Sequence, residues 1–142
     1  MEFLICLVPV LLVGAGLALF WWQNRNGPQS ARPDGTILDV VGESHYQVNL
    51  LKLCGKRKGD GEDRWFNNAH LVAEPDNPVD VNAVRVEIEG LHVGYLNRVD
   101  AAAYVAMVAQ AGPLPVRAHV RGGWYDPAGE HGHYGVRVEL ML

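Results

Sequence analysis

Alternating hydrophobic and polar residues are the dominant pattern of this chain after residue 35, and they predict a series of short β-strands. Residues 84–89, VRVEIE, place valine and isoleucine at every second position and charged residues between them. This period of two is typical of a strand with one buried and one solvated face. Gly90 then turns the chain into a hairpin partner. We expect further strands over residues 36–41, 69–73, 93–96, 116–121 and 136–142.

Two segments between these strands carry helical signals instead. Residues 100–110, DAAAYVAMVAQ, are rich in alanine, the best helix former, and Asp100 can cap their first turn. Gly112 and Pro113 end this helix, and a shorter one is expected over about residues 46–53. The strands are short and do not alternate regularly with helices. The expected fold class is therefore mainly β with minor α, a small barrel of about six strands or a curled sheet, with one or two helices.

The N-terminal residues 3–22, FLICLVPVLLVGAGLALFWW, form an uncharged apolar run. As a helix they would span about 30 Å, the hydrocarbon thickness of a bilayer, and Trp21 and Trp22 would lie in the headgroup layer. A cleaved signal peptide is the alternative, but it favours a cation before the apolar run, a shorter core and a cleavage site of small residues at its end. Here Glu2 precedes the run, which is long and ends in Phe20-Trp21-Trp22-Gln23. We therefore expect one transmembrane helix over residues 1–22, followed by a polar tether over residues 23–35.

Charges and cysteines indicate the compartment. Arg25 and Arg32 follow the apolar run and only Glu2 precedes it. The positive-inside rule therefore places the following domain in the cytoplasm, as part of a single-pass protein of the cell membrane. Cys6 lies in the apolar run and Cys54 in the domain that follows it, so the two cysteines form no disulfide framework. This absence suits a reducing compartment. The net charge of −4 argues against a general polyanion-binding surface, so any nucleic-acid contact has to be local.

Residues 74–98, EPDNPVDVNAVRVEIEGLHVGYLNR, combine two prolines, several Asx residues, a strand, a glycine turn and a second strand. Further landmarks are VVGESHYQ at residues 40–47, GGW at residues 122–124 and YGVRVEL at residues 134–140. Together they resemble the HIRAN domain over about residues 37–142, in the arrangement of a bacterial membrane-anchored member of that family. The resemblance implies a compact, OB-like β-barrel with one or two packed helices, here over residues 36–142.

The HIRAN resemblance also implies nucleic-acid binding, since the best-understood relatives hold the 3′-hydroxyl end of single-stranded DNA. In them, bases stack on aromatic rings, while polar groups of the signature loop and the V-G-x-L strand reach the terminal sugar and phosphates. The matching positions of this chain are Ser44, His45, Tyr46, Asn77, Asp80, Tyr95 and Arg98. The resemblance implies that Asn77 and Asp80 bind the terminal hydroxyl group and that Arg98 binds a phosphate. It also implies that the rings of Tyr46 and Tyr95 make the aromatic contacts with the nucleic acid.

Some of these positions differ from the relatives or have a structural alternative. The relatives that hold DNA carry an arginine in place of Ser44, a tyrosine in place of His45 and an aromatic residue in place of Val79. Asn77 and Asp80 lie beside prolines, where Asx side chains commonly bond their own backbone. Their structural alternative is to fix the shape of the loop without touching a ligand.

The last loop holds a weak candidate metal site. Asp126, His131 and His133 lie close together in the sequence, beside Glu130. A zinc site needs three or four converging ligands of defined geometry, and His-x-His beside acids in a Gly-rich loop is more often unliganded. We therefore expect no cofactor, and a metal ion such as zinc is the one alternative.

The sequence shows no catalytic motif. It lacks a Gly-rich phosphate loop with a lysine, a G-x-S-x-G elbow, a C-x-x-C pair and an H-E-x-x-H helix. We therefore expect a membrane-anchored, non-catalytic module that binds nucleic acid. The alternatives are a membrane-tethered protein-interaction or adaptor module and, as a minor one, a metal-dependent hydrolase. The expected partners are the membrane and either single-stranded nucleic acid or a protein.

Overall fold

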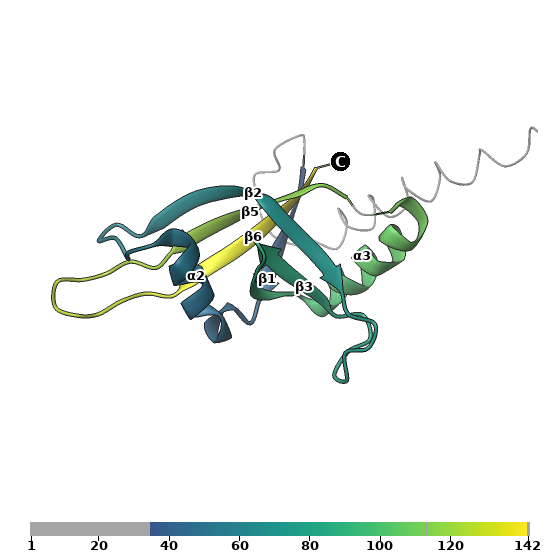
Figure 1. Ribbon diagram of the computed structural model, residues 1–142, viewed down its shortest axis with the longest axis horizontal. Coiled ribbons are helices and arrows are strands. Elements are labelled where there is room, and N and C mark those ends of the chain that lie inside the picture. The colour runs from purple at the N-terminus through teal and green to yellow at the C-terminus, as the bar shows by residue number, and fades with distance from the viewer. Residues whose placement is uncertain (1–34, 113, 142) are drawn as a thin grey trace, which may run out of the picture.

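Six antiparallel strands close into a barrel in the computed structural model, which describes residues 35–112 and 114–141 (Figure 1). The strands are β1 (Gly35–Val41), β2 (Glu62–Ala73), β3 (Val84–Ile88), β4 (Leu91–Leu96), β5 (Val116–Gly122) and β6 (Tyr134–Met141). Their order around the barrel is β1-β4-β3-β2-β5-β6, so β1 lies between β4 and β6. The expected mainly β fold of about six strands is confirmed, and two α-helices accompany it.

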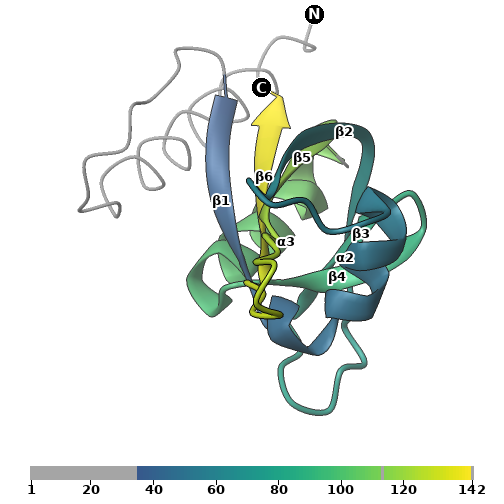
Figure 2. The same cartoon turned by 90° about the vertical axis from the view of Figure 1, so that its left-hand side faces the viewer.

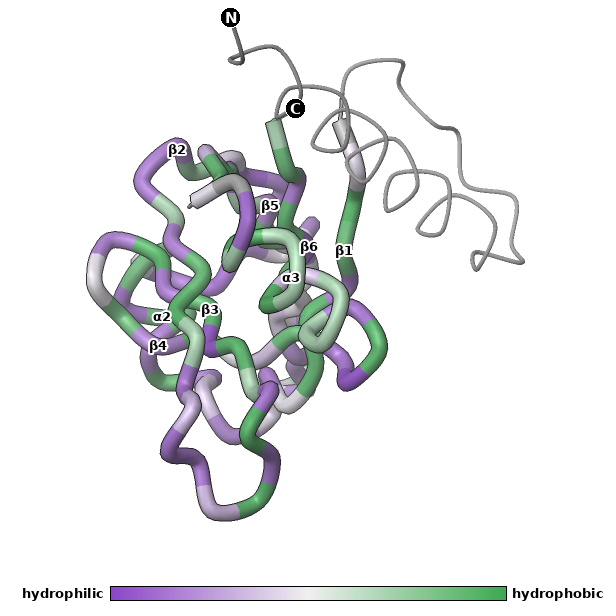
Figure 3. The backbone as a smooth tube through the Cα atoms, turned by 90° about the vertical axis from the view of Figure 1, so that its right-hand side faces the viewer, coloured by the Kyte–Doolittle hydropathy of each residue, from purple (hydrophilic) through white to green (hydrophobic). Residues whose placement is uncertain are grey.

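The alternation in the sequence matches the two faces of most strands. In β3, Val84, Val86 and Ile88 are buried, while the charged residues between them are half-buried. β5 and the first part of β6 repeat this pattern, and the alternation along the strands can be followed in Figure 3. Aliphatic side chains that point inward from all six strands therefore fill the barrel.

β2 is longer than the alternation predicts. A strand is expected only over residues 69–73, but β2 spans Glu62–Ala73. The reason is an irregularity between Phe66 and Ala69, where the register against β5 shifts. A bulge of this kind interrupts the period of two, so the pattern of buried residues no longer reads as a strand. The long strand pairs with β5 over its first part and with β3 over its last part.

The helices lie on different sides of the barrel (Figures 1 and 2). They are the short 3₁₀ helix η1 (Glu43–His45), α2 (Gln47–Cys54) and α3 (Arg98–Ala111). Both expected α-helices are thus confirmed, but the cap of α3 is Asn97 rather than Asp100. Asn97 has extended backbone angles, and its side-chain oxygen accepts a hydrogen bond from the Asp100 N–H at 2.9 Å. Asp100 therefore lies inside the first turn.

The N-terminal predictions fall outside the described part of the chain. The expected transmembrane helix over residues 1–22, and the tether over residues 23–35 except its last residue, are not among the described residues. Within the residues that are described, no helix is long and apolar enough to cross a bilayer. The anchor, its orientation and the compartment of the barrel stay predictions from the sequence.

Candidate functional site

The signature loop, residues 74–83, joins β2 to β3 and projects from the barrel (Figures 1 and 2). A hydrogen bond of 2.8 Å from the N–H of its first residue to the carbonyl oxygen of its last closes its base. The Asn77 Oδ1 atom accepts hydrogen bonds from the N–H groups of Val79 at 2.9 Å and Asp80 at 3.3 Å. The Asp80 Oδ1 atom accepts one from the Asn82 N–H at 2.9 Å. Asn77 and Asp80 therefore shape the loop, as their structural alternative predicts.

Glu74, at the start of the signature loop, joins side chains from separate segments. Its Oε2 atom accepts hydrogen bonds from the Asn77 amide at 2.9 Å and the Tyr95 hydroxyl at 3.3 Å. Its Oε1 atom accepts one from the Arg85 guanidinium at 3.0 Å. Arg85 also forms an ion pair with Glu87 at 2.9 Å. The loop, β3 and β4 thus converge on Glu74, a residue to which the sequence analysis gives no role.

Three aromatic rings lie at this point of convergence, those of Tyr46, His92 and Tyr95. The ring centroids of Tyr46 and His92 are 4.0 Å apart, and those of His92 and Tyr95 are 4.8 Å apart. His92 is therefore the central ring, although it is not among the residues predicted from the sequence. We refer to this group of contacting residues as the Glu74 cluster, which consists of Tyr46, Glu74, Asn77, Arg85, His92 and Tyr95.

Burial favours the neutral form of two rings of the Glu74 cluster, those of His92 and Tyr95, by shifting their pKa values. Burial is the main cause that lowers the pKa of His92, and the hydrogen bond of its ring to the Gly94 carbonyl oxygen opposes that effect. Burial, followed by the nearby Glu74 carboxylate, raises the pKa of Tyr95 to about 12. A neutral imidazole and a neutral phenol thus lie beside the Glu74 carboxylate and the Arg85 guanidinium.

The other predicted residues border the cluster rather than belong to it. The Arg98 Nε atom is 4.0 Å from the Asp80 Oδ2 atom, and the Arg98 side chain is 82% exposed. Ser44 and His45 lie on η1, directly before Tyr46, and both are exposed. In the described part of the chain neither of their side chains forms a hydrogen bond. Of the predicted residues, the cluster itself contains Tyr46, Asn77 and Tyr95.

The weak metal candidates do not form a site. Among the residues that the structure describes, no group of three or more His, Cys, Asp or Glu side chains could hold a metal ion. The Asp126 Oδ1 atom accepts a hydrogen bond from the Ala128 N–H at 2.6 Å and so closes a turn, while His131 and His133 are exposed. Among the described residues, Asp126, His131 and His133 are therefore not brought together as a group of ligands.

Comparison with known proteins finds similar solved structures. No protein-family model matches the chain, and no curated protein does. The crystal structure of a protein from Lactobacillus plantarum is 21% identical with a TM-score of 0.44, and the match covers 77% of this chain and 96% of that chain. The crystal structure of the HIRAN domain of human HLTF is 17% identical with a TM-score of 0.40, and the match covers 76% of each chain. Both TM-scores are below 0.5, so membership of the HIRAN family stays a prediction from the motifs.

Proposed function

We propose that this chain is a non-catalytic module that binds single-stranded nucleic acid at the Glu74 cluster and its border. One observation carries the proposal. Aromatic rings and a carboxylate that binds several donors meet at one place, and an exposed arginine lies at its border, although these residues come from distant segments. Those segments are the ones whose motifs resemble the HIRAN domain, and that resemblance supports the same function.

Base stacking is the first contribution of this arrangement. Tyr46 and Tyr95 are half-buried, and both pack against the His92 ring, so they are held in place before a ligand binds. Stacking of a base on an aromatic side chain contributes about 1–3 kcal/mol and tolerates any sequence. Rings that are already fixed lose little conformational freedom on binding, which favours affinity.

Arg98 and Asp80 supply the polar contacts at the border. Their side-chain atoms are 4.0 Å apart, beyond hydrogen-bond distance, so the 82% exposed Arg98 side chain keeps its donors for a phosphate. The Asp80 Oδ2 atom remains an acceptor for a hydroxyl group, whereas Oδ1 is used by the Asn82 N–H. The 3′-hydroxyl end of a strand, which the HIRAN resemblance implies, presents a hydroxyl group close to a phosphate.

Fluorescence anisotropy with a labelled oligothymidylate, using the full-length chain in detergent, tests this proposal. Arg98→Ala should weaken binding about tenfold at low salt, because it removes a charge-assisted hydrogen bond. Lys56→Ala is the matched control, since it removes the same charge from an exposed position in another loop. A phosphate on the 3′-hydroxyl should also weaken binding. If wild-type protein retains no oligonucleotide at low salt, the proposal is wrong.

A protein-interaction module is the second candidate, and the tip of the signature loop favours it. Val79 and Val81 are 80% and 66% exposed, and binding residues often lie on loops that a rigid scaffold positions. Absence of oligonucleotide binding would support this role. For both candidate functions we also propose the N-terminal membrane anchor. Release of the protein from membranes by alkaline carbonate would contradict this anchor.

A further inference from the structure

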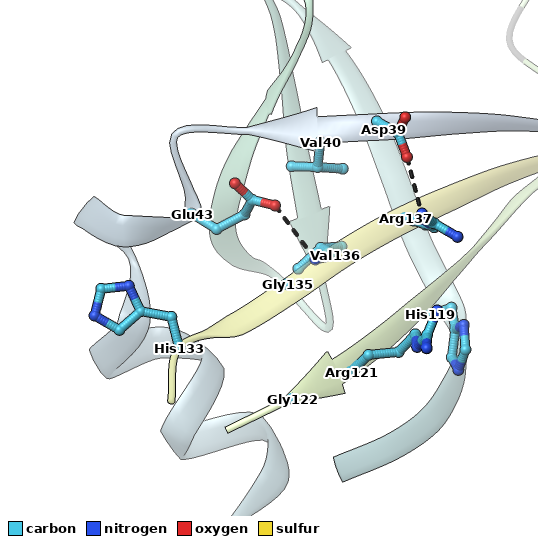
Figure 4. A pocket seen from close by; sticks show the side chains of 10 residues that line it. All are labelled: Asp39, Val40, Glu43, His119, Arg121, Gly122, His133, Gly135, Val136 and Arg137. Carbon is cyan, nitrogen blue, oxygen red and sulfur yellow. Dashed lines mark hydrogen bonds and ion pairs between the residues drawn. The ribbon is translucent and has the colours of Figure 1, made fainter. Parts of the chain in front are cut away.

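A polar groove of about 470 Å³ crosses the outer face of the barrel over β1, β5 and β6 (Figure 4). β1 lies between β4 and β6, so β1 and η1 separate the groove from the Glu74 cluster. The polar side chains that line it are Asp39, Glu43, His119, Arg121, His133 and Arg137. None of them belongs to the cluster, so the proposed function does not account for the groove.

The strand register arranges the groove in two rows. The first row crosses β1, β6, β5 and β2 through the paired residues Asp39, Arg137, His119 and Trp65. In the second row, Arg121 of β5 is paired with Gly135 of β6. A Cβ atom at Gly135 would meet no heavy atom within 4 Å, so the floor of the groove is open at this point. A position without a side chain of its own allows a ligand to approach the backbone closely.

The two arginines beside Gly135 hold hydrogen-bond donors that the described part of the protein does not use. Arg137 pairs with Asp39 through Nε, at 3.1 Å from Oδ1, and its terminal nitrogens have no hydrogen-bond partner among the described residues. Arg121 is exposed and forms no ion pair within the same ranges. Asp63, its partner in register, is hydrogen-bonded to His119 instead. Planar guanidinium groups match the oxygens of a phosphate.

The carboxylates of the groove indicate where an anion would lie. Asp39 is paired with Arg137, so its charge is offset. Glu43 lies on η1, and its Oε1 atom faces a backbone N–H of β6 at 3.4 Å. Figure 4 shows Glu43 toward one end of the groove and Arg121 toward the other. An anion is therefore expected near Arg121 and Arg137, away from Glu43.

Trp65 continues the first row beyond the arginines. Its ring is parallel to that of His119 within 3°, with centroids 4.3 Å apart, and the Arg117 guanidinium lies 4.4 Å from its centroid. Trp65 is nevertheless 41% exposed, so it presents a fixed aromatic surface next to the groove. Aromatic rings beside arginine side chains are the usual combination in proteins that bind single-stranded nucleic acid.

We propose that the groove is a second subsite, which binds the phosphodiester backbone of the same single strand whose end lies at the Glu74 cluster. This inference rests on the proposed function. A strand that leaves the cluster crosses η1, where Ser44 and His45 are exposed, and reaches Arg121 and Arg137 on the far side of β1. The cluster binds the end of the strand, and the groove adds affinity as the strand becomes longer.

Anisotropy measurements with the full-length chain in detergent and oligothymidylates of about 4 and about 16 nucleotides, the range of site sizes in OB-like folds, test the groove. Arg121→Ala and Gly135→Leu should bind the short oligonucleotide like wild type. They should lose about tenfold in affinity for the long one, because a guanidinium contact is removed or blocked. Gly135→Ala is the matched control, since its methyl group leaves most of the groove open, and it should retain both affinities.

The outcomes separate the groove from the cluster. One outcome is that affinity rises from the short to the long oligonucleotide by the same factor in wild type, Arg121→Ala and Gly135→Leu. The groove is then overturned, and the proposed function stands. If Tyr95→Ala binds both oligonucleotides like wild type while the groove variants do not, the Glu74 cluster is overturned as the site of the strand end. The groove is then the binding site itself, and its role as a second subsite is overturned too. Absence of binding to both oligonucleotides at low salt overturns both. Circular dichroism checks the fold of each variant. If Gly135→Leu does not fold, the affinities of Arg121→Ala for the two oligonucleotides test the groove by themselves.

Discussion

Replacing Gly94 with alanine should destabilise the barrel where β4 approaches β1. Gly94 is buried and has a φ of +155°, a backbone conformation that favours glycine. A Cβ atom at this position would lie 2.5 Å from the Val40 Cγ1 atom and 2.8 Å from the Val41 carbonyl oxygen. Carbon atoms do not approach their neighbours so closely, so part of β1 or β4 has to move.

Neither neighbour of Gly94 can move at low cost. Val40 is 5% exposed in the core, and its β-branched side chain has little rotamer freedom. The Val41 carbonyl belongs to the backbone of β1, which pairs with β4 at only two positions, compared with five in its pairing with β6. A displacement here therefore weakens the shortest ladder of the barrel.

The expected loss follows from these two effects. Overpacking of a core costs about 1–3 kcal/mol, and a backbone conformation that alanine disfavours adds about 1 kcal/mol or more. We therefore expect Gly94→Ala to lower the free energy of unfolding by about 3 kcal/mol, out of roughly 5–15 kcal/mol for a whole domain. At about 4–8 °C per kcal/mol, the Tm should fall by more than about 10 °C.

Thermal unfolding followed by circular dichroism measures this effect, and Gly135→Ala provides the control. Gly135 lies in β6 with no heavy atom within 4 Å of a built Cβ atom, and its φ is outside the left-handed region. Alanine there restricts the unfolded chain without a clash, so stability should stay the same or rise by about 0.5 kcal/mol. Equal Tm values for Gly94→Ala and Gly135→Ala would falsify the steric reasoning.

Two further predictions concern titrating groups. Burial, followed by the Glu62 carboxylate, raises the pKa of the Cys54 thiol to about 11. In a Cys6→Ser variant, a maleimide should therefore label Cys54 far more slowly in the native protein than in urea. Equal labelling rates in the two conditions would show that the thiol is not protected. Burial lowers the pKa of His92 in the folded state below its ordinary value of 6.5. The unfolded state therefore binds the proton more readily, and the free energy of unfolding should decrease as the pH falls below 6.5. The decrease, measured by urea unfolding from neutral to acidic pH, should be smaller in His92→Gln, and parallel profiles for the two proteins would contradict it.

The barrel could be predicted from the sequence wherever each strand keeps a period of two. β3 and β5 do so along their whole length. β2 does not, because the exposed Asn67 and Asn68 separate the buried Phe66 from the buried Ala69. The hydropathy of this segment reads as a polar loop, and only its pairing with β5 reveals a strand. Closure of the barrel through the pairing of β1 with β6 likewise depends on contacts between distant segments.

In the candidate site, local interactions could be predicted and distant ones could not. Asx residues beside prolines bond their own loop, so the shaping role of Asn77 follows from the sequence. The position of His92 does not, because β4 is irregular. Val93 and Leu96 are both buried although they are three residues apart, and the register of β3 against β4 shifts nearby. This irregularity brings His92 next to Tyr95, which a regular alternation would not do.

The internal bonding of the signature loop has a consequence for how this protein can change its ligand. The loop is held by Asn77 and Asp80, while the side chains of Val79 and Val81 remain 80% and 66% exposed at its tip. Substitutions at these two valines should cost the fold little, since they remove no buried contact. The tip is therefore a place where selection, or a protein engineer, can graft new specificity onto an unchanged scaffold.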